Sequence, residues 1–198
     1  MLCMGEMKSA FERAWERAEK VEVTEEKALE LELHPEGAKI AAQYLKEEDC
    51  DLEKAMDEFP QGKRKYIRAG AEATLISNIV LPRNGRLRRE AVRAMEGLKL
   101  LKRNKSQVSH IASQLDSLFA RYERALRKSH EDLKKELEAA LRRAMAQQSL
   151  GQPGAMPQRL DVEGSAEFQQ RWHEAQTKLD WEYAGEVSRF KEEIARVK

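Results

Sequence analysis

Two long runs of apolar residues, each recurring every three or four positions, constrain the fold of this chain most strongly. The first run lies between residues 106 and 147, and the second follows Ser165 to the last residues. Spacings of three and four place side chains on one face of an α-helix. At a rise of 1.5 Å per residue, the two helices are expected to be about 60 Å and about 50 Å long. The first face carries Val108, Ile111, Leu115, Leu118, Phe119, Tyr122, Leu126, Leu133, Leu137 and Leu141.

The segment 148–164 contains three Gly and two Pro, so it is expected to be a flexible link between the two long helices. Two one-sided helices joined in this way are typical of an antiparallel hairpin with coiled-coil-like packing. The rest of the composition agrees with a helical chain, because Ala, Leu, Glu, Lys and Arg make up 110 of the 198 residues. The sequence therefore predicts an all-α protein with two parts, a compact bundle over residues 1–103 and a helical hairpin over residues 104–198.

The helices of the bundle are predicted from capping residues and prolines. Ser9 and Glu12 form a capping box for a first helix, and Thr24 caps a second helix that runs toward His34. Pro35 is expected at the first turn of a third helix, because proline breaks helix interiors. The alternation "LELEL" at 29–33 also fits a short strand, although nothing in the sequence is an evident partner for it.

The later helices of the bundle are also predicted from capping residues and from the pattern of apolar positions. Asp49 or Asp51 can cap a short helix, and residues 69–81 are apolar on nearly every side, which is typical of a helix inside a bundle. The residues "PRNG" are expected to form a turn, in which Asn84 and Gly85 are able to adopt positive φ, and a basic helix is expected to begin near Arg86. Near residue 104 the apolar face moves around the helix by much more than the roughly 20° per heptad that supercoiling explains. We therefore expect a break there, with Asn104 ending one helix and Ser106 capping the next.

Charge is distributed very unevenly along the chain. Residues 1–58 hold 17 acidic and 8 basic side chains, residues 63–105 hold 3 acidic and 13 basic, and residues 106–198 hold 15 of each. One interpretation is that the basic segment meets phosphates of nucleic acid or of a ribosome, where each neutralised phosphate releases counterions. The residues that would do so are Lys63, Arg64, Arg68, Arg86, Arg89 and Arg93. The other interpretation, which the neighbouring acidic segment favours, is that this charge is neutralised inside the fold or by another subunit.

No sequence pattern for catalysis, a metal or a cofactor is present. His34, His110, His130 and His173 lie in separate segments without metal-ligand spacing, and no nucleotide-binding or nucleophile motif occurs. Cys3 and Cys50 lack the spacing of a redox pair, so reduced thiols are expected. No apolar run is long enough to cross a membrane, and no signal peptide starts the chain, so a cytoplasmic protein is expected.

The apolar face of the last helix is the candidate interaction surface. It is rich in aromatic residues, which are enriched where proteins bind one another, but such a stripe is more often simply core. Trp181 lies on the opposite side of this helix and is expected to contact something outside the hairpin. The leading hypothesis is a non-enzymatic interaction or scaffold protein that self-associates, as a dimer, through the hairpin. Its candidate interface residues are Phe168, Trp172, Leu179, Trp181, Tyr183, Val187, Phe190 and Ile194.

Overall fold

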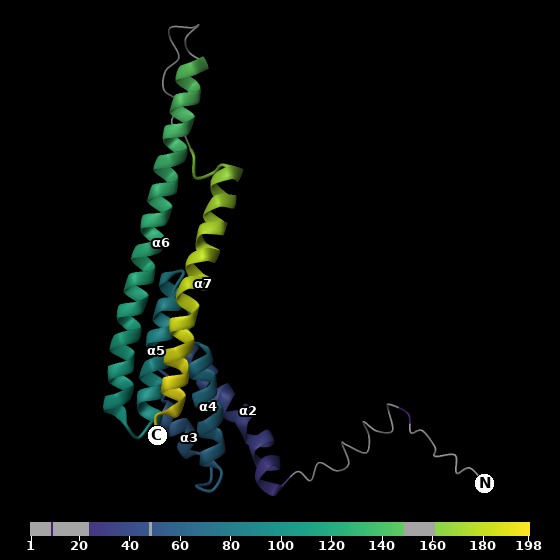
Figure 1. The fold of residues 1–198 in the computed structure, drawn as a ribbon. Helices are drawn as coiled ribbons and strands as arrows, with labels where there is room; N and C mark the ends of the chain where they lie inside the picture. Colours follow the sequence, from purple (N-terminus) through teal and green to yellow (C-terminus); the bar gives the residue numbers. More distant parts are fainter. Residues whose placement is uncertain (1–8, 10–23, 48, 149–160) are drawn as a thin grey trace, which may run out of the picture.

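A computed structural model describes residues 9, 24–47, 49–148 and 161–198 (Figure 1). The described residues form six α-helices and no β-strand, so the predicted all-α fold is confirmed. The predicted first helix after Ser9 and most of the predicted link lie outside the described residues. The helices are α2 (Glu25–Lys46), α3 (Leu52–Asp57), α4 (Arg64–Ser77), α5 (Gly85–Leu101), α6 (Lys105–Gln148) and α7 (Ala166–Arg196).

Helix α2 runs through Pro35 without ending, so the prediction of two separate helices there is wrong. Thr24 caps its start as expected, with its side chain accepting a hydrogen bond from the Lys27 amide. The helix buries residues on both sides of the proline, Leu33 before it and Gly37 and Ala41 after it. Burial against the rest of the bundle thus outweighs the helix-breaking preference of proline. The alternative of a strand at 29–33 is excluded by the same helix.

Helices α2 and α4 touch backbone to backbone at two glycines. A Cβ atom added to Gly37 would lie 1.9 Å from the carbonyl oxygen of Ile67, and one added to Gly70 would lie 2.0 Å from that of His34. No residue with a side chain fits at either position without moving a helix, since glycine alone permits such a close backbone approach. This contact fixes how α2 lies on α4.

The capping residues of α3 and α5 come directly from the sequence. Asp51 caps α3 as predicted, and the Asn84 side chain accepts a hydrogen bond of 3.0 Å from the Leu87 amide at the start of α5. Neither residue uses its capacity for positive φ here, because Asn84 is extended at a φ of −151° and Gly85 is already the first helical residue. Asparagine serves both as an N-cap and as a turn residue, and here it is the N-cap.

The predicted break near residue 104 is confirmed, since α5 ends at Leu101 and α6 begins at Lys105. The capping assignment was wrong, however. The Asn104 side chain accepts a hydrogen bond of 3.1 Å from the Gln107 amide, three residues later, which is the N-cap geometry. Ser106 is inside the helix, and its hydroxyl donates to Asn104.

The residue after α5, Lys102, is buried together with its charge. Its side chain is 8% exposed and its ammonium lies 2.7 Å from the carboxylate of Glu72 on α4, which is 19% exposed. Glu72 is the one charged residue in the otherwise apolar stretch 69–81. Lys102 therefore stays in the core although α5 has ended, and it forms an ion pair with Glu72 there.

Helices α6 and α7 lie side by side and run in opposite directions (Figure 1). Two ion pairs join them, Arg121 with Glu186 at 2.9 Å near the bundle, and Glu136 with Arg171 at 3.0 Å farther out, which is compatible with the predicted hairpin. Ser165 caps α7 as predicted, accepting a hydrogen bond of 3.2 Å from the Phe168 amide.

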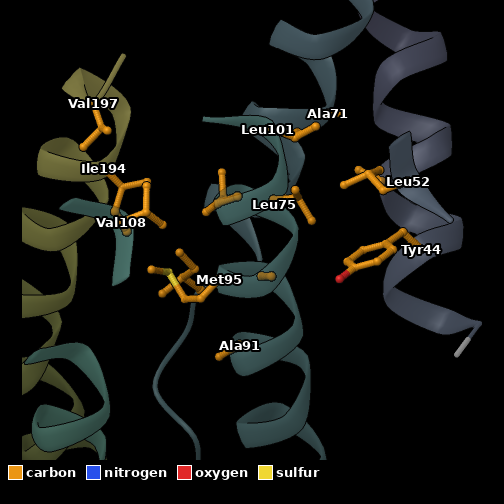
Figure 2. Close-up of a cluster of buried hydrophobic side chains, with 14 of the residues drawn as sticks. Tyr44, Leu52, Ala71, Leu75, Ala91, Met95, Leu101, Val108, Ile194 and Val197 are labelled. Atoms are coloured by element: carbon orange, nitrogen blue, oxygen red, sulfur yellow. The ribbon is translucent and has the colours of Figure 1, made fainter. Parts of the chain in front are cut away.

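The buried apolar side chains form two clusters. The main core joins α2, α3, α4 and α5 to the lower part of the hairpin, and Figure 2 shows Val108, Ile194 and Val197 beside Met95 and Leu101. A second, outer cluster within the hairpin consists of Leu133, Leu137, Val162 and Phe168, with Trp172 against it. The division of the chain at residue 103 stays a prediction, and the main core includes residues from both sides of it.

Candidate functional site at the waist of the hairpin

Between the two apolar clusters lies a polar network that connects three segments, and we call this region the waist. Tyr122 of α6 is fully buried, and its hydroxyl donates to the carboxylate of Asp180 on α7. The guanidinium of Arg83, just before α5, donates to the other carboxylate oxygen of Asp180. Asp180 is 15% exposed. The waist therefore holds a shielded carboxylate whose two oxygens are both engaged.

Burial and the neighbouring carboxylate both act on Tyr122. Removal from water disfavours the charged phenolate and raises the pKa of Tyr122, and the hydrogen bond to Asp180 raises this pKa further. The Tyr122 hydroxyl thus stays protonated as a hydrogen-bond donor. The ring of Tyr183 packs edge-on against it at a centroid distance of 5.4 Å. Tyr122 thus provides a buried hydrogen bond between α6 and α7.

Two open pockets flank the network. The first, of about 400 Å³, lies between α7 and the segment that leads into α5, and aliphatic residues such as Ile79, Leu87 and Val187 line it. Arg83, Asp180 and Lys191 are its charged residues. We call it the Lys191 pocket.

The second pocket, of about 370 Å³, lies on the side of the outer cluster, and Arg83, Arg127, His130 and Trp172 line it. The His130 ring packs edge-on against Trp172 at 4.9 Å and against Phe168 at 5.1 Å. His130 is therefore part of an aromatic wall. This pocket carries acidic Glu123 and Glu131 as well as its basic residues, so its charge selects for no one class of ligand.

The structure divides the predicted interface residues of α7 into two groups. Phe168 belongs to the outer cluster, and Val187 and Ile194 belong to the main core, so these three are buried within their own chain. The half-buried residues of the same face are Trp172, Leu179, Tyr183 and Phe190. Helix α6 and the bundle cover most of this face, and its role in self-association stays a prediction. Trp181 differs from all of them, because it is 82% exposed on the opposite side of the helix.

Two of the predicted phosphate-binding residues are engaged inside the fold. Arg64 forms an ion pair with Asp57 and donates to the carbonyl oxygens of Phe59 and Asp57. Arg93 donates to the carbonyl oxygens of Tyr44 and Glu47 at the end of α2 and stacks on the Tyr44 ring at 4.4 Å. A cation at a helix C-terminus is favourable there. Both guanidinium groups are therefore held by partners within the fold.

The remaining four residues do not form one surface. Lys63 and Arg68 lie at the start of α4, and Arg86 and Arg89 lie at the start of α5. The two helices are antiparallel, since Glu72 of α4 meets Lys102 at the end of α5. The two pairs thus lie at opposite ends of the α4 and α5 pair. Lys65 contacts Glu26 at 2.7 Å, so part of the basic segment is indeed neutralised by the acidic one.

Sequence reasoning missed most of the waist. Tyr122 was predicted only as part of an apolar stripe, and Arg83, Asp180 and Lys191 were not singled out. For Lys191 a signal existed, because the positions three and four residues away on either side hold Val187, Ser188, Ile194 and Ala195, which carry no acidic group. A lysine on a half-buried face without such a neighbour has no ion-pair partner on its own helix.

Metal sites and membrane-spanning helices are not found in the part of the chain that the structure describes. The described residues include no group of three or more His, Cys, Asp or Glu side chains that could hold a metal ion. Within those same ranges, no helix is long and apolar enough to span a membrane. Cys50 is half-buried, and burial raises the pKa of its thiol, which makes it less reactive. Cys3 lies outside the described residues.

Comparison with known proteins places the chain in a family without assigning an activity. A search of curated proteins and a search of solved structures each found no match. The model of one family matches residues 53–196, a region that holds α4 to α7 and with them the waist and both pockets. Because this match covers most of the chain, the protein belongs to the family of unknown function DUF6657.

Proposed function

We propose that the protein is a non-enzymatic helical interaction protein that forms a two-fold dimer through the outward face of α7, centred on Trp181. A cytoplasmic location is part of this proposal. The observation that carries it is the exposure of Trp181, whose large indole is 82% accessible in the middle of a 31-residue helix. Tryptophan is among the residues most enriched at the centre of protein interfaces.

The residues around Trp181 support a second copy as the partner. Four of its neighbours on the outward face are small, namely Thr177, Ala184, Gly185 and Ser188, and all four are exposed, as is the neighbouring Lys178. A Cβ atom added to Gly185 would meet nothing within 4 Å, so open space lies one helical turn from the indole. A bulky side chain and an open position on the same face are self-complementary. In an antiparallel pair of α7 helices, each Trp181 packs over the Gly185 of its partner, as two-fold symmetry requires.

The expected affinity follows from the area that the indoles cover. Burying two tryptophan side chains removes roughly 300 to 500 Å² from water, since each buries about 150 to 250 Å². At about 25 cal/mol per Å², this is a gross gain of roughly 7 to 12 kcal/mol. Association itself costs about 4 to 15 kcal/mol, so the flanking residues must add to the contact. Because the gain and the cost are of similar size, we expect a weak dimer, with a dissociation constant between about 1 and 100 µM.

Sedimentation velocity between about 1 and 100 µM tests this proposal. The wild-type chain should shift from monomer to dimer over that range. Trp181→Glu and Gly185→Lys should both stay monomeric, because the first removes the indole and the second fills the space that receives it. Leu31→Glu on α2 is the matched control, since Leu31 is also an exposed apolar residue, at 72%, but lies on another helix. A wild-type chain that is monomeric at 100 µM, or a Trp181→Glu variant that still dimerises, refutes the proposal.

A further inference from the structure

The Lys191 pocket contains a positive charge that its surroundings do not neutralise. Lys191 is half-buried, and in the described part of the chain it makes one hydrogen bond, of 3.2 Å, to the carbonyl oxygen of Ser77 at the end of α4, and no ion pair. An ammonium group has three donors. The contact with Ser77 is favourable for a cation, but it leaves two donors without a protein acceptor.

The other charges of the pocket cancel each other. Arg83 and Asp180 form an ion pair, and Tyr122 occupies the second oxygen of Asp180. Asp180 is thus not available to Lys191. The net charge of the pocket lining is one positive charge, which belongs to Lys191.

The environment of this charge is apolar. Ile79, Val80, Leu81, Leu87 and Val187 line the pocket, and its volume of about 400 Å³ is within the range of small-molecule sites. Burial lowers the pKa of Lys191, because it disfavours the charged form and no anion restores it. An anion placed beside the ammonium would reverse this shift.

We propose that the Lys191 pocket binds a small monocarboxylate with an apolar body, with its carboxylate on the ammonium of Lys191 and its chain along Ile79, Leu87 and Val187. One unneutralised cation matches one negative charge, which favours a carboxylate over a doubly charged phosphate. The aliphatic lining matches a hydrocarbon chain rather than a sugar or a nucleotide. The two proposals share Ala184 and Ser188, which line the pocket and also border the proposed dimer contact, but Trp181 and Gly185 do not line it. Octanoate binding is therefore also measured in the Trp181→Glu variant, where we expect it to be retained.

The test is an NMR titration of the full-length chain with octanoate, followed through the methyl signals of Ile79, Leu87 and Val187. Octanamide is the neutral counterpart of the same length. We expect saturable shifts with octanoate and binding at least about tenfold weaker for octanamide, since hydrogen bonds to charged groups are the stronger ones.

Three variants test whether Lys191 is the residue that binds the carboxylate of octanoate. Lys191→Met keeps the length of the side chain without its charge and should weaken octanoate binding at least about tenfold, whereas Lys191→Arg should retain it. Lys178→Met removes an exposed lysine of the same helix that does not line the pocket, and it should bind like the wild type. The absence of saturable shifts up to about 10 mM octanoate, equal affinity for octanamide, or undiminished binding by Lys191→Met would overturn the proposal. The methyl spectrum of each variant also reports whether it is folded.

Discussion

Replacing Gly70 by alanine should destabilise the protein, although alanine is the better helix former. The added Cβ would lie 2.0 Å from the carbonyl oxygen of His34. Carbon and oxygen approach one another to about 3.3 Å at the closest, so α2 and α4 would have to separate locally by roughly 1.3 Å. The obstacle is backbone, which cannot rotate away as a side chain can. We therefore take the upper part of the range for overpacking, about 3 kcal/mol.

The helix propensity of alanine offsets about 1 kcal/mol of this cost, so the net loss should be about 2 kcal/mol. Gly185→Ala is the matched control, because Gly185 is also inside a helix but has open space at its Cβ position. It should stabilise the chain by about 0.5 to 1 kcal/mol. Urea unfolding of both variants at low micromolar concentration, followed by far-ultraviolet circular dichroism, measures the difference. If Gly70→Ala proves as stable as the wild type, the backbone contact between α2 and α4 does not exist as described.

Three further predictions concern the buried polar groups. Glu72→Gln leaves Lys102 buried without a counter-charge and should lower the free energy of unfolding in urea by about 3 kcal/mol. The double variant Glu72→Leu with Lys102→Met should recover most of this loss. Equal losses in the two variants would contradict the buried ion pair between Glu72 and Lys102. Tyr122→Phe removes the donor to Asp180 and should cost about 1.5 to 3 kcal/mol, and a neutral result would show that the hydroxyl is not needed there. The pKa of Lys191 is lower in the folded state than its ordinary value of 10.5, so the folded chain binds fewer protons than the unfolded chain as pH approaches that value. Stability should accordingly rise more between pH 7 and pH 10 in the wild type than in Lys191→Met, and identical slopes would mean that Lys191 is fully solvated.

The sequence predicted those features of the fold that depend on neighbouring residues. The period of the apolar positions indicated the two long helices, and short polar residues ahead of such runs identified the caps Thr24, Asp51 and Ser165. The register change near residue 104 indicated the break between α5 and α6. Each of these inferences uses interactions within a few residues along the chain.

The errors arose where distant parts of the chain decide the local structure. Pro35 remains inside a helix because α2 is buried on both sides of it, and the sequence near Pro35 does not contain that information. Periodicity shows that a face of α7 is apolar but not what covers it, so the sequence does not tell that Val187 and Ile194 belong to the main core. Lys102 and Glu72 are 30 residues apart, and Asp180 is 58 residues from Tyr122, so neither pair has a signature in the local sequence.

The Tyr122 and Asp180 contact also determines how the two long helices align. Leucine and valine side chains are nearly interchangeable along a helix, so apolar packing alone tolerates a shift of α7 along α6 by a heptad. Such a slide would separate Asp180 from Tyr122 and from Arg83, and in one direction it would place the carboxylate beside the buried Leu115. Together with the ion pairs of Arg121 with Glu186 and of Glu136 with Arg171, this buried polar contact therefore favours one alignment of the two helices, while the two apolar clusters supply most of the packing.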